Sequence, residues 1–447
     1  MPVNRAYLRV TAHTLAAACA IACGGRASLS AIAVDSDGGG APRGDTSADA
    51  AADAELPDGA GYLPDLGPQS AAYQINAAHT GSTDDASLFG APSRRWAHDF
   101  GGPVAFPLIA HGKVIATFIT GERPADKRVS VQAFDALTGA SVWGPIDLGV
   151  SDTASSAYDG GRVFTLDRAG LMHALDVDTG GVLWTAQLGT VAASEQFLGA
   201  PTAFGGRVYI LPNNYGKAAA VDEMTGRVAW KGARSGGSAS PAVTDSAVFV
   251  AVGCRNAYRL DRATGATVWH IEAGCSASPG TPVVVDETVF LFSESTLHWA
   301  DARTGAVSTT ATGATLPPAM HGGVGFIPVN GRLHALSLPP VTGGVSWQYL
   351  PARGTPFIRT SPMVAGGHVH VLWDDCTLRA FDATTGDPVW SDSEPSACTG
   401  PVISGGGPVA MAAAAGTIAV PYRRHLVVYG LASADAGTGT VSDAGTD

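Results

Sequence analysis

The sequence predicts an all-β protein: an eight-bladed β-propeller built from four-stranded antiparallel blades. Three observations lead to this fold class. A motif of the form Asp-x-x-Thr-Gly-x-x-x-Trp returns every 38 to 46 residues, each repeat has room for four short strands, and an N-terminal strand completes the last repeat. A period in this range, combined with strand patterning, is typical of a radial or linear repeat fold.

The motif can be followed through its Thr-Gly pairs. We expect its Asp to accept hydrogen bonds inside a turn, its Gly to supply a positive φ, and its Trp to pack between repeats. Two repeats depart from the pattern, because Thr309 stands in place of one Trp and Pro339 in place of one Asp. The complete repeats contain Asp135, Gly139 and Trp143; Asp176, Gly180 and Trp184; Asp222, Gly226 and Trp230; Asp261, Gly265 and Trp269; and Asp382, Gly386 and Trp390.

The strand content of a single repeat distinguishes a propeller from a solenoid. In the fourth repeat we predict strands at Ser240–Val243, Ala247–Val252, Ala257–Leu260 and Thr267–Trp269, joined by short turns. Four antiparallel strands in about forty residues are typical of a propeller blade. A solenoid would show one or two strands in a shorter repeat.

The eighth blade is predicted to be composite. After Trp390, the ranges Pro401–Gly405, Thr417–Tyr422 and Leu426–Tyr429 supply three strands, but no fourth strand follows them. The missing strand stands instead at the other end of the chain, at Ser93–Gly101, and contains Trp96. Joining the two closes the ring and removes the sheet edges. Eight blades is our prediction, with seven as the alternative.

The N-terminus is predicted to be a lipoprotein signal peptide over residues 1–22. Two arginines precede an apolar run of thirteen residues, Val10–Ala22, which is too short to span a bilayer. The small residues before Cys23 resemble the lipobox of bacterial lipoproteins, in which the cysteine is lipidated and becomes the mature N-terminus. Cys19 is the alternative lipidation site. We therefore expect an exported, lipid-anchored protein at the outer membrane or cell surface.

Residues 23–70 are predicted to be a disordered tether rich in Ala, Asp, Gly and Ser, residues 71–431 the propeller, and residues 432–447 a disordered acidic tail. Much of the formal net charge of −12 lies in the tether and the tail. Nucleic-acid binding needs a clustered basic surface. We therefore expect no nucleic-acid partner.

The repeat resembles that of the PQQ-like (quinoprotein alcohol dehydrogenase-like) β-propeller superfamily over about residues 72–431. The stretch Ala72–Gly81 also resembles the segment that precedes many such domains. With its lipobox, the chain is similar to the BamB-type propeller lipoproteins of the outer membrane. The resemblance is specific for fold and much less so for function.

The same resemblance raises the question of a cofactor. Quinoprotein dehydrogenases of this superfamily carry a disulfide between adjacent cysteines over PQQ, and acidic and amide ligands for Ca²⁺. This sequence has no adjacent cysteine pair. We expect no cofactor, no metal site and no catalytic residues.

Four cysteines remain in the predicted propeller: Cys254, Cys275, Cys376 and Cys398. The first two flank one repeat's Thr-Gly turn, and the last two flank another at nearly the same distances. Each pair falls in the second-to-third-strand loop and the crossover to the next blade, which lie on one face. An exported location favours disulfides. We predict the pairs Cys254–Cys275 and Cys376–Cys398.

The loops on this cysteine-bearing face are the predicted partner-binding surface, because loops carry function on rigid scaffolds. The alternative is that each is a solvated turn. The candidate residues are Glu122, Arg123, Asp126, Lys127 and Arg128, then Asn213, Asn214 and Tyr215, then Asp374 and Asp375.

The functional prediction is a non-catalytic protein-binding scaffold of the bacterial cell envelope, monomeric outside its complex. A BamB-like role in outer-membrane protein assembly is what the resemblance implies. One alternative is an enzyme, either a quinoprotein dehydrogenase or another propeller enzyme. Another is recognition of a cell-surface glycan or peptide.

Overall fold

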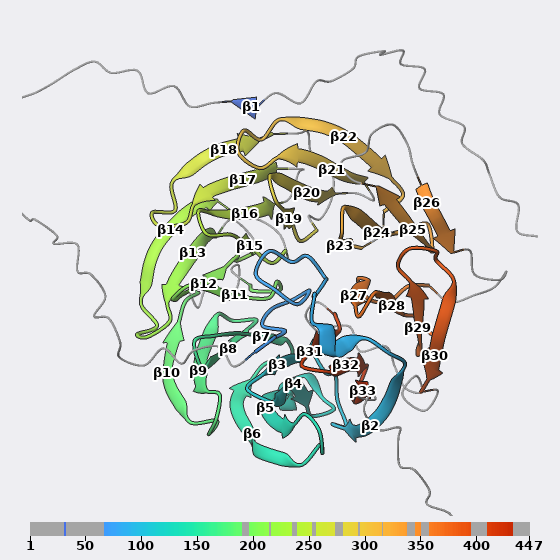
Figure 1. The fold of residues 1–447 in the computed structure, drawn as a ribbon. Coiled ribbons are helices and arrows are strands. Elements are labelled where there is room, and N and C mark those ends of the chain that lie inside the picture. Colours follow the sequence, from blue (N-terminus) through green and yellow to red (C-terminus); the bar gives the residue numbers. More distant parts are fainter. Residues whose placement is uncertain are drawn as a thin grey trace, which may run out of the picture.

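The computed structural model describes residues 31–32, 67–189, 196–213, 216–234, 239–252, 256–272, 280–293, 296–314, 316–337, 345–349, 357–394 and 409–431. Eight separate sheets stand around a common centre, each with four strands running from the channel to the rim (Figure 1). The eight-bladed prediction is confirmed and the seven-bladed alternative is wrong.

The first four blades follow the chain from Leu108 to Ile271. The strands of blade 1 are β3 (Leu108–Ala110), β4 (Lys113–Thr120), β5 (Arg128–Asp135) and β6 (Ser141–Val150). Those of blade 2 are β7 (Ala154–Asp159), β8 (Arg162–Asp167), β9 (Leu171–Asp176) and β10 (Val182–Gln187). Those of blade 3 are β11 (Thr202–Phe204), β12 (Arg207–Ile210), β13 (Lys217–Asp222) and β14 (Val228–Arg234). Those of blade 4 are β15 (Ala242–Val243), β16 (Ala247–Val252), β17 (Asn256–Asp261) and β18 (Thr267–Ile271), with β1 (Ala31–Ile32) paired to the rim of β18.

The remaining blades continue in the same way to Leu431. The strands of blade 5 are β19 (Val283–Val285), β20 (Thr288–Ser293), β21 (Thr296–Asp301) and β22 (Val307–Thr312). Those of blade 6 are β23 (Ala319–His321), β24 (Val324–Val329), β25 (Arg332–Ser337) and β26 (Val345–Tyr349). Those of blade 7 are β27 (Met363–Ala365), β28 (His368–Leu372), β29 (Thr377–Asp382) and β30 (Pro388–Ser393).

Blade 8 is the predicted composite. Its strands are β31 (Ala412–Ala414), β32 (Thr417–Tyr422), β33 (His425–Leu431) and, at the rim, β2 (Pro92–Asp99) from the N-terminal side (Figure 1). The range predicted for its first strand, residues 401–405, lies outside the described residues, and Ala412–Ala414 forms the innermost strand instead. All three alanines are fully buried.

The Asp-Thr-Gly turn has the predicted hydrogen bonds. In blade 2, Oδ1 of Asp176 accepts from the backbone N–H and the hydroxyl of Thr179, at 2.8 and 2.9 Å. Gly180 has a φ of 73°. These bonds fix a tight turn between the third and fourth strands, which aims its backbone carbonyls at the neighbouring blade.

In six of the eight blades the Trp of the fourth strand docks on this turn in the next blade. The indole N–H of Trp143 in blade 1 donates to the carbonyl of Val177 in blade 2 at 2.9 Å. The indole ring covers Gly180, where an added Cβ would lie 2.7 Å from the ring. Glycine is thus required for its backbone angle and for the close approach of the ring. The same donor bond is made by Trp96, Trp184, Trp230, Trp269 and Trp347 to the turn of the following blade.

The described residues contain two short 3₁₀ segments and no longer helix: η1 (Ala86–Leu88) and η2 (Pro124–Asp126). None of the helices in this part of the chain is long and apolar enough to cross a bilayer. The apolar core lies between neighbouring sheets, in clusters that join one blade to the next. The blades therefore form one continuous ring.

Candidate functional site

The propeller has two distinct faces. The turn face carries the turns between first and second strands and between third and fourth strands. The loop face carries the second-to-third-strand loops and the crossovers between blades. Because strand direction alternates within each sheet, the described partner-binding candidates and Cys376 belong to the loop face; they are Glu122, Arg123, Asp126, Lys127, Arg128, Asn213, Asp374 and Asp375.

On the turn face, residues 70–85 cross the centre of the ring; we call this segment the cap (Figure 1). It contains the stretch Ala72–Gly81 that sequence analysis singled out. The cap hydrogen-bonds to all eight blades. Its partners, in blade order, are Ile109, Tyr158, Thr202, Val243, Val284, Met320, Val364 and Ala415.

His79 is the buried centre of the cap. Its side chain has no exposed surface, and its two ring nitrogens lie 3.2 Å from the carbonyl of Pro282 and 3.3 Å from the hydroxyl of Thr202. Burial lowers the pKa of His79 to about 4, against a weaker opposing effect of the Pro282 hydrogen bond. His79 is therefore neutral at physiological pH and acts as a structural tie between blades.

On the loop face, the predicted partner-binding residues do not converge. The loop from Glu122 to Arg128 belongs to blade 1, Asn213 to blade 3, and Asp374 and Asp375 to blade 7, so no two of these loops are on adjacent blades. Asn214 and Tyr215 lie outside the described residues.

Three charged side chains of the blade 1 loop form ion pairs, within the loop or with the adjacent strand. Arg123 pairs with Asp126 at 2.6 Å, and Arg128 pairs with Asp147 at 2.6 Å. In blade 7, Arg379 lies 3.6 Å from Asp375. The paired side chains of blade 1 are about half exposed or more, and those of blade 7 less so, so the two loops offer separate charged surfaces.

Among the predicted disulfide residues, Cys376 is disulfide-bonded and fully buried, in the loop between β28 and β29. Cys254, Cys275 and Cys398 lie outside the described residues, as do Cys19 and Cys23. The two predicted pairings and the lipidation site therefore stay predictions.

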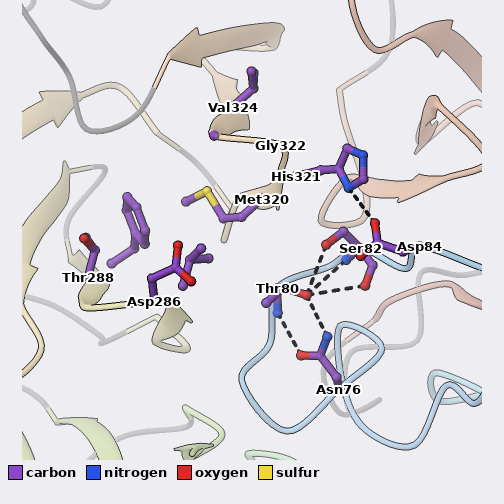
Figure 2. Close-up of a pocket in the computed structure, with 13 residues that line it drawn as sticks. Asn76, Thr80, Ser82, Asp84, Asp286, Thr288, Met320, His321, Gly322 and Val324 are labelled. Atoms are coloured by element: carbon purple, nitrogen blue, oxygen red, sulfur yellow. Dashed lines mark hydrogen bonds and ion pairs between the residues drawn. The ribbon is translucent and has the colours of Figure 1, made fainter.

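The turn face also has a groove, of about 550 Å³, between blades 5 and 6 and the cap (Figure 2). Val285 and Phe290 from blade 5 and Met320 from blade 6 form its apolar floor. Asp84 of the cap and Asp286 of blade 5 stand at its rim. Sequence analysis did not identify this groove, because its walls come from three distant segments of the chain.

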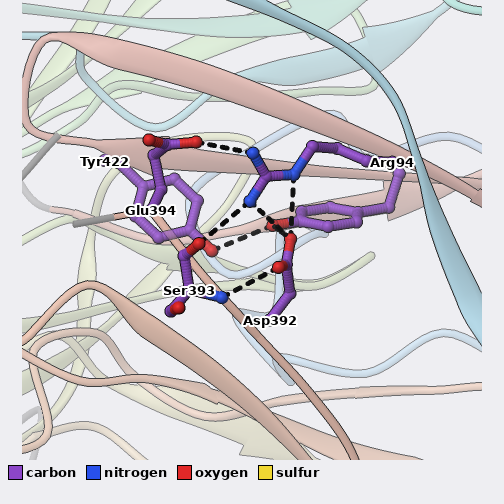
Figure 3. A network of polar contacts seen from close by, with 6 residues as sticks. Arg94, Asp392, Ser393, Glu394 and Tyr422 are labelled. Atoms are coloured by element: carbon purple, nitrogen blue, oxygen red, sulfur yellow. Dashed lines mark hydrogen bonds and ion pairs between the residues drawn. The ribbon is translucent and has the colours of Figure 1, made fainter. Parts of the chain in front are cut away.

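The junction between blades 7 and 8 has a polar network in place of the usual turn (Figure 3). The guanidinium of Arg94 on β2 donates to Asp392 of blade 7 through Nε at 2.9 Å and Nη2 at 2.6 Å, and to Glu394 through Nη1 at 2.5 Å. Tyr429 donates its hydroxyl to the same oxygen of Asp392 at 3.0 Å. The N-terminal strand is thereby tied to the last complete blade.

Replacing Arg94 by alanine is expected to destabilise the fold by about 1 kcal/mol. A well-formed but half-exposed network contributes only slightly more to the free energy of unfolding than a simple surface ion pair does. Thermal unfolding at low and high salt measures this, with the difference shrinking at high salt. The matched control is Arg123→Ala, whose partner Asp126 lies in the same loop. An equal loss in both variants would show that the network at this junction has no special role.

A carboxyl pair is buried between blades 2 and 3. Glu223 is only 2% exposed, and burial, followed by the nearby carboxylate of Asp159, raises its pKa to about 9. Glu223 is therefore protonated at neutral pH and shares a hydrogen bond with Asp159. Its own backbone carbonyl accepts the indole N–H of Trp184.

We expect wild-type stability to fall as pH rises from about 5 to 9. In that window the folded state binds one more proton than the unfolded state, at a cost of up to about 1.4 kcal/mol per pH unit. Glu223→Gln keeps a donor for Asp159 and removes the titration. The variant should equal the wild type near pH 5 and exceed it near pH 9 in denaturant unfolding. Parallel pH profiles for the two proteins would contradict this assignment.

Within the described residues, no three His, Cys, Asp or Glu side chains gather into a group that could hold a metal ion. The expectation of no cofactor stays a prediction.

Fold and repeat together define the class: an eight-bladed PQQ-like propeller. The chain belongs to the family whose model is described as outer membrane protein assembly factor BamB, which matches residues 127–349 and 294–441. It is similar to the outer membrane protein assembly factor BamB of Moranella endobia (strain PCIT), with 26% identity over 238 residues, covering 52% of this chain. The chain spans about half, 54%, of that relative's length.

Two solved structures show the same fold. BamB from Moraxella catarrhalis has a TM-score of 0.57 at 18% identity, covering 76% of this chain and 99% of that chain. The quinohemoprotein alcohol dehydrogenase from Comamonas testosteroni has a TM-score of 0.63 at 14% identity, covering 81% of this chain and 80% of that chain. At these identities the likeness concerns the fold, which a binding protein and an enzyme share.

Proposed function

We propose that this protein is a protein-binding scaffold of the bacterial envelope that assists the assembly of outer-membrane proteins. The observation that carries the proposal is the family match, which covers most of the propeller and whose description names that role. The Moranella relative carries the same description. An enzymatic role has no support of equal specificity, since the dehydrogenase likeness is one of fold.

In this proposal the loop face is the partner-binding surface. The rigid ring holds the loop from Glu122 to Arg128 and the acidic pair Asp374 and Asp375 on one face, exposed to solvent. Exposed loops on a rigid scaffold are common recognition surfaces. Their charges set orientation and association rate more than affinity.

A lipid anchor at Cys23 completes the proposal, with the predicted tether of residues 23–70 between the membrane and the propeller. Cys23→Ala is the test of the anchor. The substituted protein should move from the membrane fraction to the soluble fraction, whereas Cys19→Ala should leave the partitioning unchanged. The reverse result would assign lipidation to Cys19.

Affinity capture from detergent-solubilised membranes tests the scaffold role. The full chain should recover components of the machinery that assembles outer-membrane proteins, identified by mass spectrometry. The variant Arg123→Ala/Lys127→Ala should recover less. The matched control, Arg227→Ala/Arg303→Ala, removes the same charge from the turn face and should recover as much as the wild type. A bound quinone or dye-linked alcohol oxidation by the purified protein would instead support the enzyme alternative.

A further inference from the structure

The junction between blades 5 and 6 is built differently from the others. In blades 2, 3, 4 and 6 a Phe or Tyr of the second strand, an Ala or Arg of the third, and the motif Trp of the fourth form one cross-strand row. Examples are Phe164, Ala174 and Trp184 in blade 2, Phe249, Arg259 and Trp269 in blade 4, and Phe326, Ala335 and Trp347 in blade 6.

In blade 5 the indole has moved one strand inward. The row there is Phe290, Trp299 and Thr309, and the ring centroids of Phe290 and Trp299 lie 6.0 Å apart. The indole N–H of Trp299 is buried with no hydrogen-bond partner among the described residues, whereas the motif Trp residues donate to the next blade. In the sequence of blade 6, Pro339 replaces the turn Asp. Both exceptions to the motif therefore belong to this one junction.

The groove of about 550 Å³ lies at this same junction, on the turn face. Met320, which packs in one cluster with Trp299 and Phe290, forms the groove floor beside Val285. The groove therefore offers an apolar floor on the inner strands of the junction whose outer turn lacks the standard indole dock. Its volume is within the range of sites that bind small ligands or a pair of side chains.

The rim of the groove is acidic. Asp84 comes from the cap, with its side chain 92% exposed, and Asp286 comes from the exposed turn between β19 and β20. Figure 2 shows the two carboxylates on separate walls of the groove. His321 lies 3.4 Å from Asp84. A cationic side chain placed between the walls would face two carboxylates, while an adjacent apolar side chain would meet the floor.

We propose that this groove binds a segment of a partner protein that presents an apolar side chain next to an arginine or lysine. The chain's own flanking segments fit this chemistry poorly, because their only two cations, Arg26 and Arg43, stand among eight acids in residues 24–66 and residues 432–447 have none. Residues 24–66 and 432–447 contain no Trp or Phe and are strongly acidic, so the rim repels them. The site is on the face opposite to the loop face and is independent of the scaffold role proposed above.

The probe for this site is the dipeptide acetyl-Phe-Arg-amide, and the reporter is the methyl group of Met320. In the full chain labelled with ¹³C at methionine methyl groups, the Met320 signal, assigned through Met320→Leu, should shift saturably on titration. The buried Met172 of blade 2 and Met411 beside blade 8 should not shift. Acetyl-Phe-Glu-amide should leave Met320 unchanged.

Two double variants complete the test. Asp84→Asn/Asp286→Asn should weaken binding by about five-fold, as expected from the loss of two exposed ion pairs. Asp245→Asn/Glu287→Gln removes the same charge from the adjacent groove between blades 4 and 5 and should leave binding within about two-fold. The proposal is overturned if Met320 does not respond to the basic probe, responds equally to the acidic one, or is unaffected by the first double variant.

Discussion

Trp143→Ala is expected to destabilise the propeller by about 3–5 kcal/mol, the range for removing a large buried aromatic side chain. The side chain is 7% exposed and packs in the cluster that joins blades 1 and 2. Its loss would uncover Gly180 and leave the carbonyl of Val177 without its indole donor. The substitution would create a cavity and remove the hydrogen bond at the same time. The neighbouring sheets cannot collapse into the cavity without breaking the turn.

Denaturant unfolding followed by tryptophan fluorescence and circular dichroism measures this loss. The adjacent Val142 is the matched control, because it is 44% exposed on the same strand. Val142→Ala should change the stability by no more than about 0.5 kcal/mol. A loss below about 1 kcal/mol for Trp143→Ala would mean that the docked indole is not what holds adjacent blades together.

The docking geometry explains why the fold could be predicted from the sequence. Each motif residue has one local role: Asp fixes the turn, Gly lets the indole ring of the neighbouring blade approach the turn, and Trp supplies that ring. Because most junctions between blades need the same contact, the residues that make it recur at regular intervals in the sequence. The closure by the strand at Trp96 could be predicted for the same reason, since its indole docks on the turn at Gly139 as the others do.

The cap could be recognised as a recurring segment, but its placement could not be predicted. It is attached largely through backbone hydrogen bonds to the innermost strands, and such bonds impose no side-chain pattern. His79 is the exception, yet a single histidine in a loop gives no indication that it is buried and bonded to both blade 3 and blade 5.

The groove between blades 5 and 6 could be predicted only in part from the sequence. Thr309 and Pro339 were visible as two separate exceptions to the motif, but the sequence does not show that the Trp of one blade meets the turn of the next. Glu223 is easier to recognise as an exception in the sequence. In other blades the residue after the motif Asp is Ala136, Val177, Arg262, Ala302 or Ala383, so an acid at this position is unusual. The position lies at a blade junction, because its backbone carbonyl accepts the indole N–H of the neighbouring blade.

Removal of the N-terminal strand is expected to abolish cooperative folding. A chain that starts at Gly67 keeps the cap and β2, and one that starts at Gly90 keeps β2 alone. A chain that starts at Gly101 has neither. In the last, β33 becomes an open edge, because β2 pairs with it from Pro92 to Asp99.

The chain that starts at Gly101 should lose far more stability than the removal of one strand of four would suggest, because β2 contacts both neighbouring blades. Trp96 docks on blade 1, and Arg94 binds blade 7. We expect the chain from Gly67 to melt as the full chain does, the chain from Gly90 to melt cooperatively at a lower temperature, and the chain from Gly101 to aggregate. Circular dichroism and size-exclusion chromatography distinguish the three. A monomeric, cooperatively melting chain from Gly101 would show that seven complete blades hold together without the closing strand, and that ring closure contributes little to stability.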